Sequence, residues 1–280
     1  MYKRKDFCER EIVLNRRLCD GMYEGVLPIV RSKDGLRIGG EGEPVEYTVK
    51  MTEFPQSALM SNMLKKGKVG KELVGEIAHI IADFHAKAER GRKINEGGSL
   101  VTIKFNCHEN YRQTEKFVGD IIPKVKRDFV IQKMDKFMSD RSSLFKSRVR
   151  NGKIRDCHGD VRPGNIFIHK GKIYIFDCIE FNTRFRYGDV ASEVAFMCVD
   201  LDFNGRRDLS AHFRDEYIRK SGDEDLLALF PFYCCYRADV GIKTSALKSE
   251  DQGVPIKERH QAREMSRRYS VLSLKYARQL

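Results

Sequence analysis

The residues best suited to chemistry lie in one polar stretch of the sequence, His158-Gly-Asp-Val-Arg-Pro-Gly-Asn165. Its aspartate and its asparagine are five residues apart on a tight loop opened by glycine and proline, so both side chains can face one cavity. A carboxylate can orient a hydroxyl group and accept its proton, and amide and carboxylate oxygens are typical Mg²⁺ ligands. Asp160 and Asn165 are therefore the first candidates for a reactive site.

A further carboxylate follows this loop at the end of a predicted strand. Two β-branched runs, Ile166–Ile168 and Ile173–Phe176, are joined by His169-Lys-Gly-Lys172 and predict a hairpin. The hairpin returns Asp177, twelve residues after Asn165, to the same cavity. Phosphoryl transfer depends mainly on positioning and charge neutralisation, and the spaced Asp, Asn and strand-end Asp indicate a site of that kind.

The elements around this site are segregated by type rather than alternating. Apolar residues at helical spacing predict helices at Asp6–Leu18, Lys71–Glu89 and 115–150, and from Asp189 to the C-terminus with breaks at 221–223 and 253–255. Strand-like runs at Gly25–Val30 and Val45–Met51, separated by turn residues that include Lys33-Asp-Gly, predict an early hairpin. This order of elements predicts an α+β fold rather than alternating βαβ units.

The loop and the strand-end aspartate resemble the catalytic loop and metal-binding aspartate of the protein-kinase-like superfamily. They are most similar to the aminoglycoside phosphotransferase and choline kinase branch, which has His-Gly-Asp where protein kinases have His-Arg-Asp. Further stretches resemble a bacterial aminoglycoside phosphotransferase family group that is often fused to a P-loop ATPase domain. These stretches are Phe7–Arg17, Asn110–Thr114, Asp177–Asn182 and Phe232–Ala238.

The resemblance implies an ATP- and Mg²⁺-dependent phosphotransferase that acts on a hydroxyl group of a small molecule. In it Asp160 is the catalytic base, His158 organises the loop, and Asn165 and Asp177 bind Mg²⁺. It also implies that Asp189 is a buried carboxylate that steadies the catalytic loop, although an ordinary helix N-cap explains that residue equally well.

The same resemblance implies two lobes: an N-terminal lobe at 1–54 and a mostly helical C-terminal lobe at 55–280. The hinge that receives the adenine would lie at 51–54 and would include Met51 and Glu53. Glu11 lies where the small-lobe helix would offer a glutamate to an ATP-anchoring lysine. Glu9 is a close rival for that role, and a solvated helix glutamate is the simpler alternative.

The family's small lobe begins with strands that carry a phosphate-covering loop and the ATP-anchoring lysine, whereas this sequence begins at the following helix. We therefore expect a truncated N-terminal lobe. Gly39–Gly42 followed by Lys50 imitates the glycine loop and the lysine, but the spacing is too short for two full strands. Gly67–Lys71 lacks P-loop spacing, so we expect no ATPase domain in this sequence.

Two other functions stay open, one because of the charge and one because of the missing N-terminal strands. A net charge of +12 and a pI near 9.3 favour a basic nucleic-acid-associated protein, although no Lys/Arg block or RNA-binding aromatic signature accompanies the charge. A kinase-like regulatory module with weak nucleotide binding is the second alternative. We find no signal peptide and no apolar stretch of the ~18 residues that cross a bilayer, so we expect a cytoplasmic protein without a membrane partner.

Eight cysteines occur without a C-x-x-C pair, so we expect reduced thiols and no structural zinc. Cys157 and Cys178 directly adjoin His158 and Asp177. They are either thiols through which reagents block the site or buried packing residues.

Overall fold

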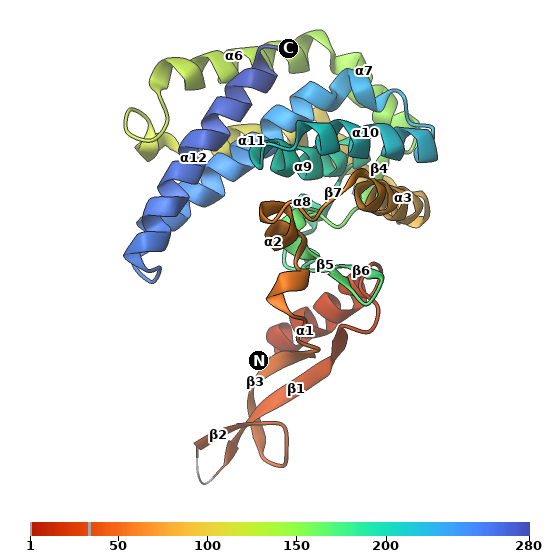
Figure 1. Ribbon diagram of the computed structural model, residues 1–280, viewed down its shortest axis with the longest axis vertical. Coiled ribbons are helices and arrows are strands. Elements are labelled where there is room, and N and C mark those ends of the chain that lie inside the picture. Colours follow the sequence, from red (N-terminus) through yellow and green to blue (C-terminus); the bar gives the residue numbers. More distant parts are fainter. Residues whose placement is uncertain (1, 33–34) are drawn as a thin grey trace. The chain divides into compact units, whose positions relative to one another are not determined.

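The computed structural model describes residues 2–32 and 35–280 of the chain (Figure 1). The strands are β1 (Tyr23–Ser32), β2 (Gly35–Ile38), β3 (Glu43–Met51), β4 (Ile154–Asp156), β5 (Ile166–His169), β6 (Lys172–Ile175) and β7 (Tyr187–Asp189). The helices are α1 (Tyr2–Asn15), α2 (Met60–Lys65), α3 (Lys71–Lys87), α4 (Arg92–Asn95), α5 (Leu100–Gln113), α6 (Lys124–Asp140), α7 (Ser142–Arg150), α8 (Thr183–Arg186), α9 (Val190–Phe203), α10 (Arg207–Ser221), α11 (Leu226–Glu250) and α12 (Ile256–Ala277). None of these helices combines the length and the apolar character that crossing a membrane requires.

The chain forms two compact units, which we call the sheet unit and the helical unit. The sheet unit combines Met1–Gly70 with His158–Arg186, and the helical unit combines Lys71–Cys157 with Tyr187–Leu280. The polar loop and its hairpin thus pack with the N-terminal residues. The lobe boundary at residue 54 stays a prediction.

A three-stranded antiparallel sheet in the order β2-β1-β3 forms the first part of the sheet unit (Figure 1). The predicted pairing of the two early runs is confirmed, with Val26 opposite Val49. Strand β2, which pairs Ile38 with Ile29, was not predicted. All four of its residues are exposed, so no buried alternation marks it in the sequence. The predicted turn residues Lys33 and Asp34 lie outside the described residues.

The core of the sheet unit joins its N-terminal elements to the later hairpin. Strands β5 and β6 pair antiparallel with Ile166 opposite Ile175, which confirms the predicted hairpin. The ring of Phe54, just after β3, lies 5.6 Å from that of Phe167 and 4.7 Å from that of Tyr174. Aromatic side chains of this kind bury large apolar areas, so they fix the hairpin against the segment that follows β3.

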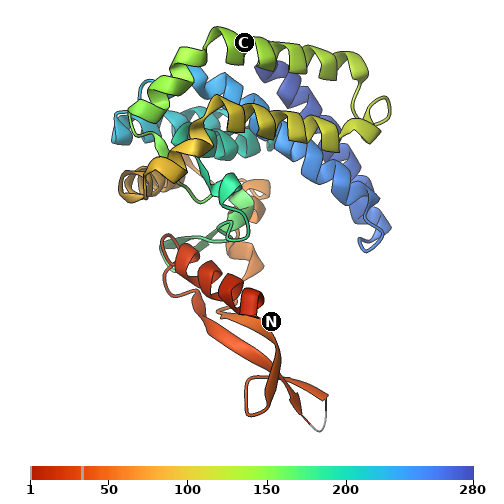
Figure 2. The ribbon, with the colours of Figure 1, turned by 180° about the vertical axis from the view of Figure 1, so that it is seen from behind.

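Amphipathic and fully apolar helices build the helical unit. The predicted helix from Lys71 is confirmed as α3, which buries Val74, Ile77 and Ile81 and packs against α10. Helix α9 is buried on almost every side, and its buried residues include the polar Glu193 and Asp200 beside its many apolar ones. Seen from behind, α5 and α6 lie over the blue helices α11 and α12 (Figure 2).

Helices α11 and α12 approach each other closely at one glycine. A Cβ atom on Gly241 would lie 2.7 Å from the ring of Tyr269. The Tyr269 ring stacks on Phe203 with centroids 4.1 Å apart, and its hydroxyl donates to Asp200 at 2.7 Å. Because the tyrosine is fixed on both sides, only glycine fits opposite it.

A two-stranded ladder in the helical unit brackets the polar loop in sequence. Strand β4 ends just before the loop and β7 begins just after α8, with Ile154 opposite Asp189. Neither strand was predicted, because three residues are too few to show an alternating pattern. The ladder anchors both ends of the segment that carries the candidate site.

Candidate active site

The polar loop closes on itself through its asparagine. The Asn165 Nδ2 atom donates to the backbone oxygen of Asp160 at 3.0 Å and to its carboxylate Oδ2 at 2.7 Å. These bonds fix the Asp160 side chain and leave the amide Oδ1 of Asn165 as its acceptor atom. The five-residue spacing in the sequence therefore does place the two side chains together.

The turn at the start of the loop depends on a glycine. Gly159 has a φ of 92°, and a Cβ atom there would lie 3.0 Å from both Ile179 Cδ1 and the Phe185 oxygen. The following amide, that of Asp160, donates to His158 Nδ1 at 3.4 Å. The buried histidine ring is thus turned back onto the loop backbone. Its role in organising the loop stays a prediction.

Backbone hydrogen bonds join the strand-end aspartate to this loop from both sides. The Phe176 amide donates to the Asn165 oxygen at 3.0 Å, and the Ile179 amide donates to the His158 oxygen at 3.1 Å. Asp177 lies between these two bonds. The structure therefore brings together the predicted residues of the loop and of the hairpin within one compact unit.

Asp177 adopts a backbone conformation that side chains of L-residues rarely take. Its φ is 64°, in the left-handed region that favours glycine. Its amide donates to the Tyr23 hydroxyl at 3.3 Å, and the next amide, that of Cys178, donates to Asn15 Oδ1 at 2.9 Å. Strain of this kind persists only where the surroundings fix it, and it is concentrated at functional sites.

Electrostatics at the loop favour a bound cation. The Asp177 side chain is open to solvent, yet partial burial raises its pKa, Asp160 raises it further, and Arg162 acts in the opposite direction. Arg162 Nε lies 3.3 Å from the Asp160 carboxylate. Two carboxylates beside one half-exposed guanidinium leave negative charge uncompensated, and the amide oxygen of Asn165 completes a donor set that suits Mg²⁺. The residues present therefore fit the metal that the resemblance implies.

Of the two rival glutamates on α1, Glu11 lies near the strand-end aspartate. Its pKa is raised by burial, by Glu180 and by Asp177. Glu9 is exposed and pairs with Lys5 on the same helix at 3.5 Å. An anchoring role for Glu11 stays a prediction.

The predicted hinge residues lie at the end of β3. Met51 pairs with Tyr23 and packs against the core of the sheet unit, whereas Glu53 is exposed. The Thr52 amide between them donates to the Met22 oxygen at 2.8 Å. Lys50 pairs with Glu24 on an exposed face, in agreement with its identification as a false match to the ATP-anchoring lysine.

Asp189 belongs to a buried ionic network that lies within the helical unit. Its carboxylate accepts from the Ala191 amide at 2.9 Å, which confirms the predicted N-cap of α9. Arg148 donates to both Asp189 oxygens, at 2.9 and 2.7 Å, and to both oxygens of Asp223. Sequence reasoning missed Arg148 and Asp223, since no local spacing links residues so far apart. The loop-steadying role of Asp189 stays a prediction.

The buried cysteines next to the loop behave as packing residues. Cys157 and Cys178 are 3% and 1% exposed. Burial raises the pKa of the Cys157 thiol well above its ordinary value, as do Glu193 and nearby aspartates. The burial of both thiols therefore favours the alternative that these cysteines are packing residues.

Comparisons with known proteins concern the fold of this chain and part of its sequence. The family model described as "phosphotransferase enzyme family" matches residues 124–231. An ethanolamine kinase of Plasmodium vivax has a similar structure, with a TM-score of 0.53 and 14% identity, over 94% of this chain and 71% of that one. The likeness to this kinase shows the kind of fold that the chain has, and the family model matches part of the chain, residues 124–231. The predicted α+β, kinase-like fold is thereby confirmed.

Relatives in bacteria extend the similarity along the chain. Uncharacterized proteins of Mycobacterium tuberculosis and Mycobacterium bovis are 33% identical over 258 residues, which is 90% of this chain. The chain spans 49% of the length of these relatives.

Proposed function

We propose that this chain transfers the γ-phosphoryl group of ATP, with Mg²⁺, to a hydroxyl group of a small molecule. The observation that carries the proposal is the closed set of hydrogen bonds that holds Asp160, Asn165 and Asp177 within one loop and hairpin. An uncompensated pair of carboxylates beside an amide oxygen is the donor set that phosphoryl transfer requires.

Asp160 would orient the acceptor hydroxyl and take its proton. As the acceptor oxygen bonds to the γ-phosphorus, the bond from that phosphorus to the β–γ bridging oxygen breaks and ADP leaves. The Asn165 amide, which donates to Asp160 Oδ2, keeps that carboxylate in one orientation throughout. Bound Mg²⁺ would neutralise the phosphate oxygens, with Asn165 Oδ1 and the Asp177 carboxylate as its ligands.

The nucleotide would bind along the sheet unit. We assign the adenine to the end of β3, at Met51 and Glu53, and an anchoring role to Glu11, which lies near Asp177. The aromatic contact between Phe54 and Phe167 supports this arrangement, since it links the predicted hinge directly to the hairpin that ends at Asp177.

Calorimetry of nucleotide binding tests the metal assignment. We expect ATP to bind the parent chain only with Mg²⁺, and Asp177→Ala to abolish that dependence. Asp208→Ala is the matched control, because Asp208 is exposed and pairs with Arg206, two residues before it, on the surface. Unchanged binding by Asp177→Ala would remove Asp177 from the metal site. Normal binding without ADP formation on any tested alcohol would favour the regulatory module.

A further inference from the structure

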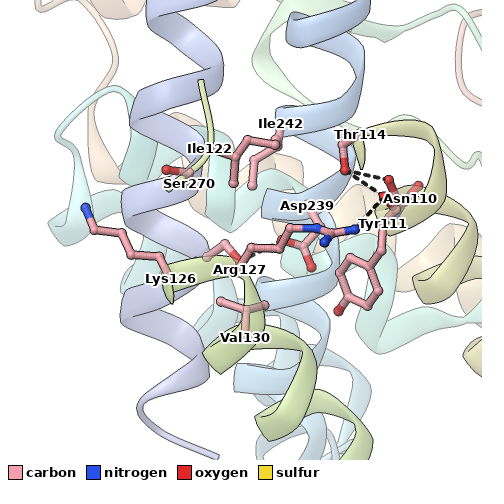
Figure 3. A pocket seen from close by; sticks show the side chains of 11 residues that line it. Asn110, Tyr111, Thr114, Ile122, Lys126, Arg127, Val130, Asp239, Ile242 and Ser270 are labelled. Carbon is pink, nitrogen blue, oxygen red and sulfur yellow. Dashed lines mark hydrogen bonds between the residues drawn. The ribbon is translucent and has the colours of Figure 1, made fainter. Parts of the chain in front are cut away.

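Three buried side chains in the helical unit come together from distant parts of the sequence. They are His85 near the end of α3, Cys157 directly after β4, and Glu193 in the first turn of α9. A ring nitrogen, a sulfur and a carboxylate oxygen, one from each, all lie within 4.8 Å of one another. The side chains are 3%, 3% and 1% exposed. None of them is among the described residues that line the pocket between α5, α6, α11 and α12 in Figure 3.

The histidine of this cluster is held in one orientation. Its Nδ1 atom lies 2.9 Å from the hydroxyl oxygen of the buried Tyr217, and its Nε2 atom lies 2.8 Å from Glu193 Oε2. When Nδ1 donates to the hydroxyl, Nε2 and Oε2 are both acceptors, so they need a shared cation, either a proton or a metal ion. Histidines that bind metals are typically held in this way through their other ring nitrogen.

The electrostatic surroundings of the thiol also favour a metal ion. In the metal-free chain, burial raises the pKa of Cys157, and so do Glu193 and two nearby aspartates, whereas Arg237 acts in the opposite direction. Carboxylates that disfavour a thiolate attract a divalent cation, and a bound metal ion deprotonates a coordinating thiol. The packing role that burial favours for this cysteine therefore describes the metal-free chain, and a metal ion would convert it to a ligand.

The three ligand types indicate zinc rather than magnesium. Mg²⁺ and Ca²⁺ prefer oxygen ligands alone, whereas Zn²⁺ binds thiolate, imidazole and carboxylate together. Zinc–ligand bonds of about 2.0–2.3 Å place tetrahedral ligands roughly 3.3–3.8 Å apart. The separations in the cluster run from 2.8 Å to at most 4.8 Å, so side-chain movements of about 1 Å would bring them into this range.

We propose that His85, Cys157 and Glu193 bind one Zn²⁺ ion, with water in the fourth position. The sequence led us to expect no zinc, because it has no C-x-x-C pair, whereas these ligands are far apart, with 108 positions between His85 and Glu193. The site goes beyond the proposed phosphoryl transfer and rests on none of its residues. Because Cys157 directly precedes His158, zinc would fix the chain at the start of the polar loop.

Elemental analysis of the intact chain tests the proposal. The chain is expressed without a histidine tag in zinc-supplemented medium and is dialysed against a weak chelator. We expect close to one zinc ion per chain after dialysis. Exchange for Co²⁺ should produce the charge-transfer absorption of a cobalt–thiolate bond. Excess Mg²⁺ should displace neither ion, because Mg²⁺ takes oxygen ligands.

Cys157→Ser is the main variant, because it nearly keeps the size of the side chain. We expect at least about 100-fold weaker zinc binding, since loss of even an outer partner of a ligand costs about 10–100-fold. Tyr217→Phe removes such a partner and should weaken binding about 10-fold. Cys198→Ser is the matched control, because this thiol is also buried, on α9, but contacts the Ser210 oxygen at 3.4 Å. Asp177→Ala should keep its zinc, which separates this site from the phosphoryl-transfer site.

The proposal is overturned if the dialysed parent chain holds no zinc and its cobalt form has no thiolate band, a result that needs no variant. In that case a proton joins His85 to Glu193. Equal zinc content in the parent and in Cys157→Ser would also overturn it, because the ion would then lie elsewhere, for example at the partly exposed pair of His79 and Glu216. Equal loss of zinc in Cys198→Ser and Cys157→Ser would contradict a specific role for Cys157.

Discussion

Two clusters in this chain each combine two aspartates with one arginine, but they differ in burial and in hydrogen bonding. In the sheet unit, Asp160 and Asp177 share one arginine, Arg162, whose side chain is 41% exposed. In the helical unit, Asp189 and Asp223 share Arg148, which is 3% exposed and donates to oxygens of both. The helical-unit cluster is saturated with hydrogen bonds, whereas the sheet-unit cluster keeps acceptors open.

This difference shows that residues of the same type can have different roles, depending on their burial and on their hydrogen bonds. Buried charges that satisfy one another fix a structure and have nothing left to offer a ligand. Half-exposed charges that do not balance are available to a metal or a substrate. Substitutions in the two clusters should therefore change different measurements.

The largest effect on the free energy of unfolding should follow from removing the arginine of the cluster in the helical unit. Arg148→Met removes the guanidinium that donates to the two buried carboxylates Asp189 and Asp223, and it should lower the free energy of unfolding by about 3–5 kcal/mol. Although burial alone would raise it, Arg148 holds the pKa of Asp223 below its ordinary value. The pair therefore stabilises the fold above the pKa of an unfolded aspartate, about 4, and this contribution is lost as the pH falls through the lower folded pKa.

Urea unfolding at pH 7 and pH 3 measures this effect, which should shrink at the lower pH. Lys153→Met is the control, because Lys153 contacts Asp223 from a more exposed position at 3.3 Å and should matter less. Equal destabilisation by the two variants would contradict the distinction between the clusters.

Asp160→Asn should affect turnover and little else. Losing a positioned base costs about 10²-fold or more in rate, while the amide still occupies the same space. Initial rates of ADP formation, together with nucleotide binding by calorimetry, make the comparison. A variant that turns over like the parent would show that Asp160 is not the base.

A smaller effect is expected at Asp239, a buried carboxylate on helix α11. Its pKa is raised to about 7, mainly by burial. Because the pKa of this carboxyl group is higher in the folded state, its stabilising contribution is fully present below the pKa of an unfolded aspartate, near 4. The contribution is lost as the pH rises through the folded pKa of about 7. Three pKa units correspond to about 4 kcal/mol, and we expect Asp239→Asn to recover roughly half at pH 8.

Thermal unfolding from pH 4 to pH 8 should show the Asp239→Asn gain only at the upper end. A gain that is constant across this range would mean that the carboxylate does not titrate on folding. Ser245→Ala on the same helix controls for substitution of a buried polar residue.

The smallest effect concerns the two cysteines beside the loop. Both thiols are buried, so labelling by a maleimide should be slow in the folded chain and should require opening. Cys8 is partly exposed and should label first. Mass spectrometry with and without Mg²⁺–ATP compares the sites, and rapid labelling of Cys157 or Cys178 would contradict their burial.

Local spacing was enough to predict the loop, the hairpin and their aspartates. Asp160 and Asn165 are five residues apart, and the hairpin returns Asp177 within twelve more, so the chain itself fixes their proximity. Helix α3 was predicted for the same reason, since its apolar stripe repeats within every turn.

Features that depend on distant pairing could not be predicted. Arg148 meets Asp189 from 41 residues away, and Ser273 meets Asp239 from 34. Strand β2 carries no buried face, and the three-residue ladder of β4 and β7 is too short to leave a pattern. The left-handed backbone at Asp177 is accompanied by hydrogen bonds from its own amide to Tyr23 and from the amide of Cys178 to Asn15, which only the fold reveals.

The left-handed backbone at position 177 influences which residue types selection would favour there. Glycine and asparagine occupy such a conformation at less cost than aspartate with its charge beside Asp160. Selection for heat resistance alone would therefore favour them, and each would remove the carboxylate. If Asp177 serves the proposed metal site, we expect glycine or asparagine to replace it first in descendants that no longer bind metal. On that proposal, an aspartate at this position marks the lineages in which metal binding is still under selection.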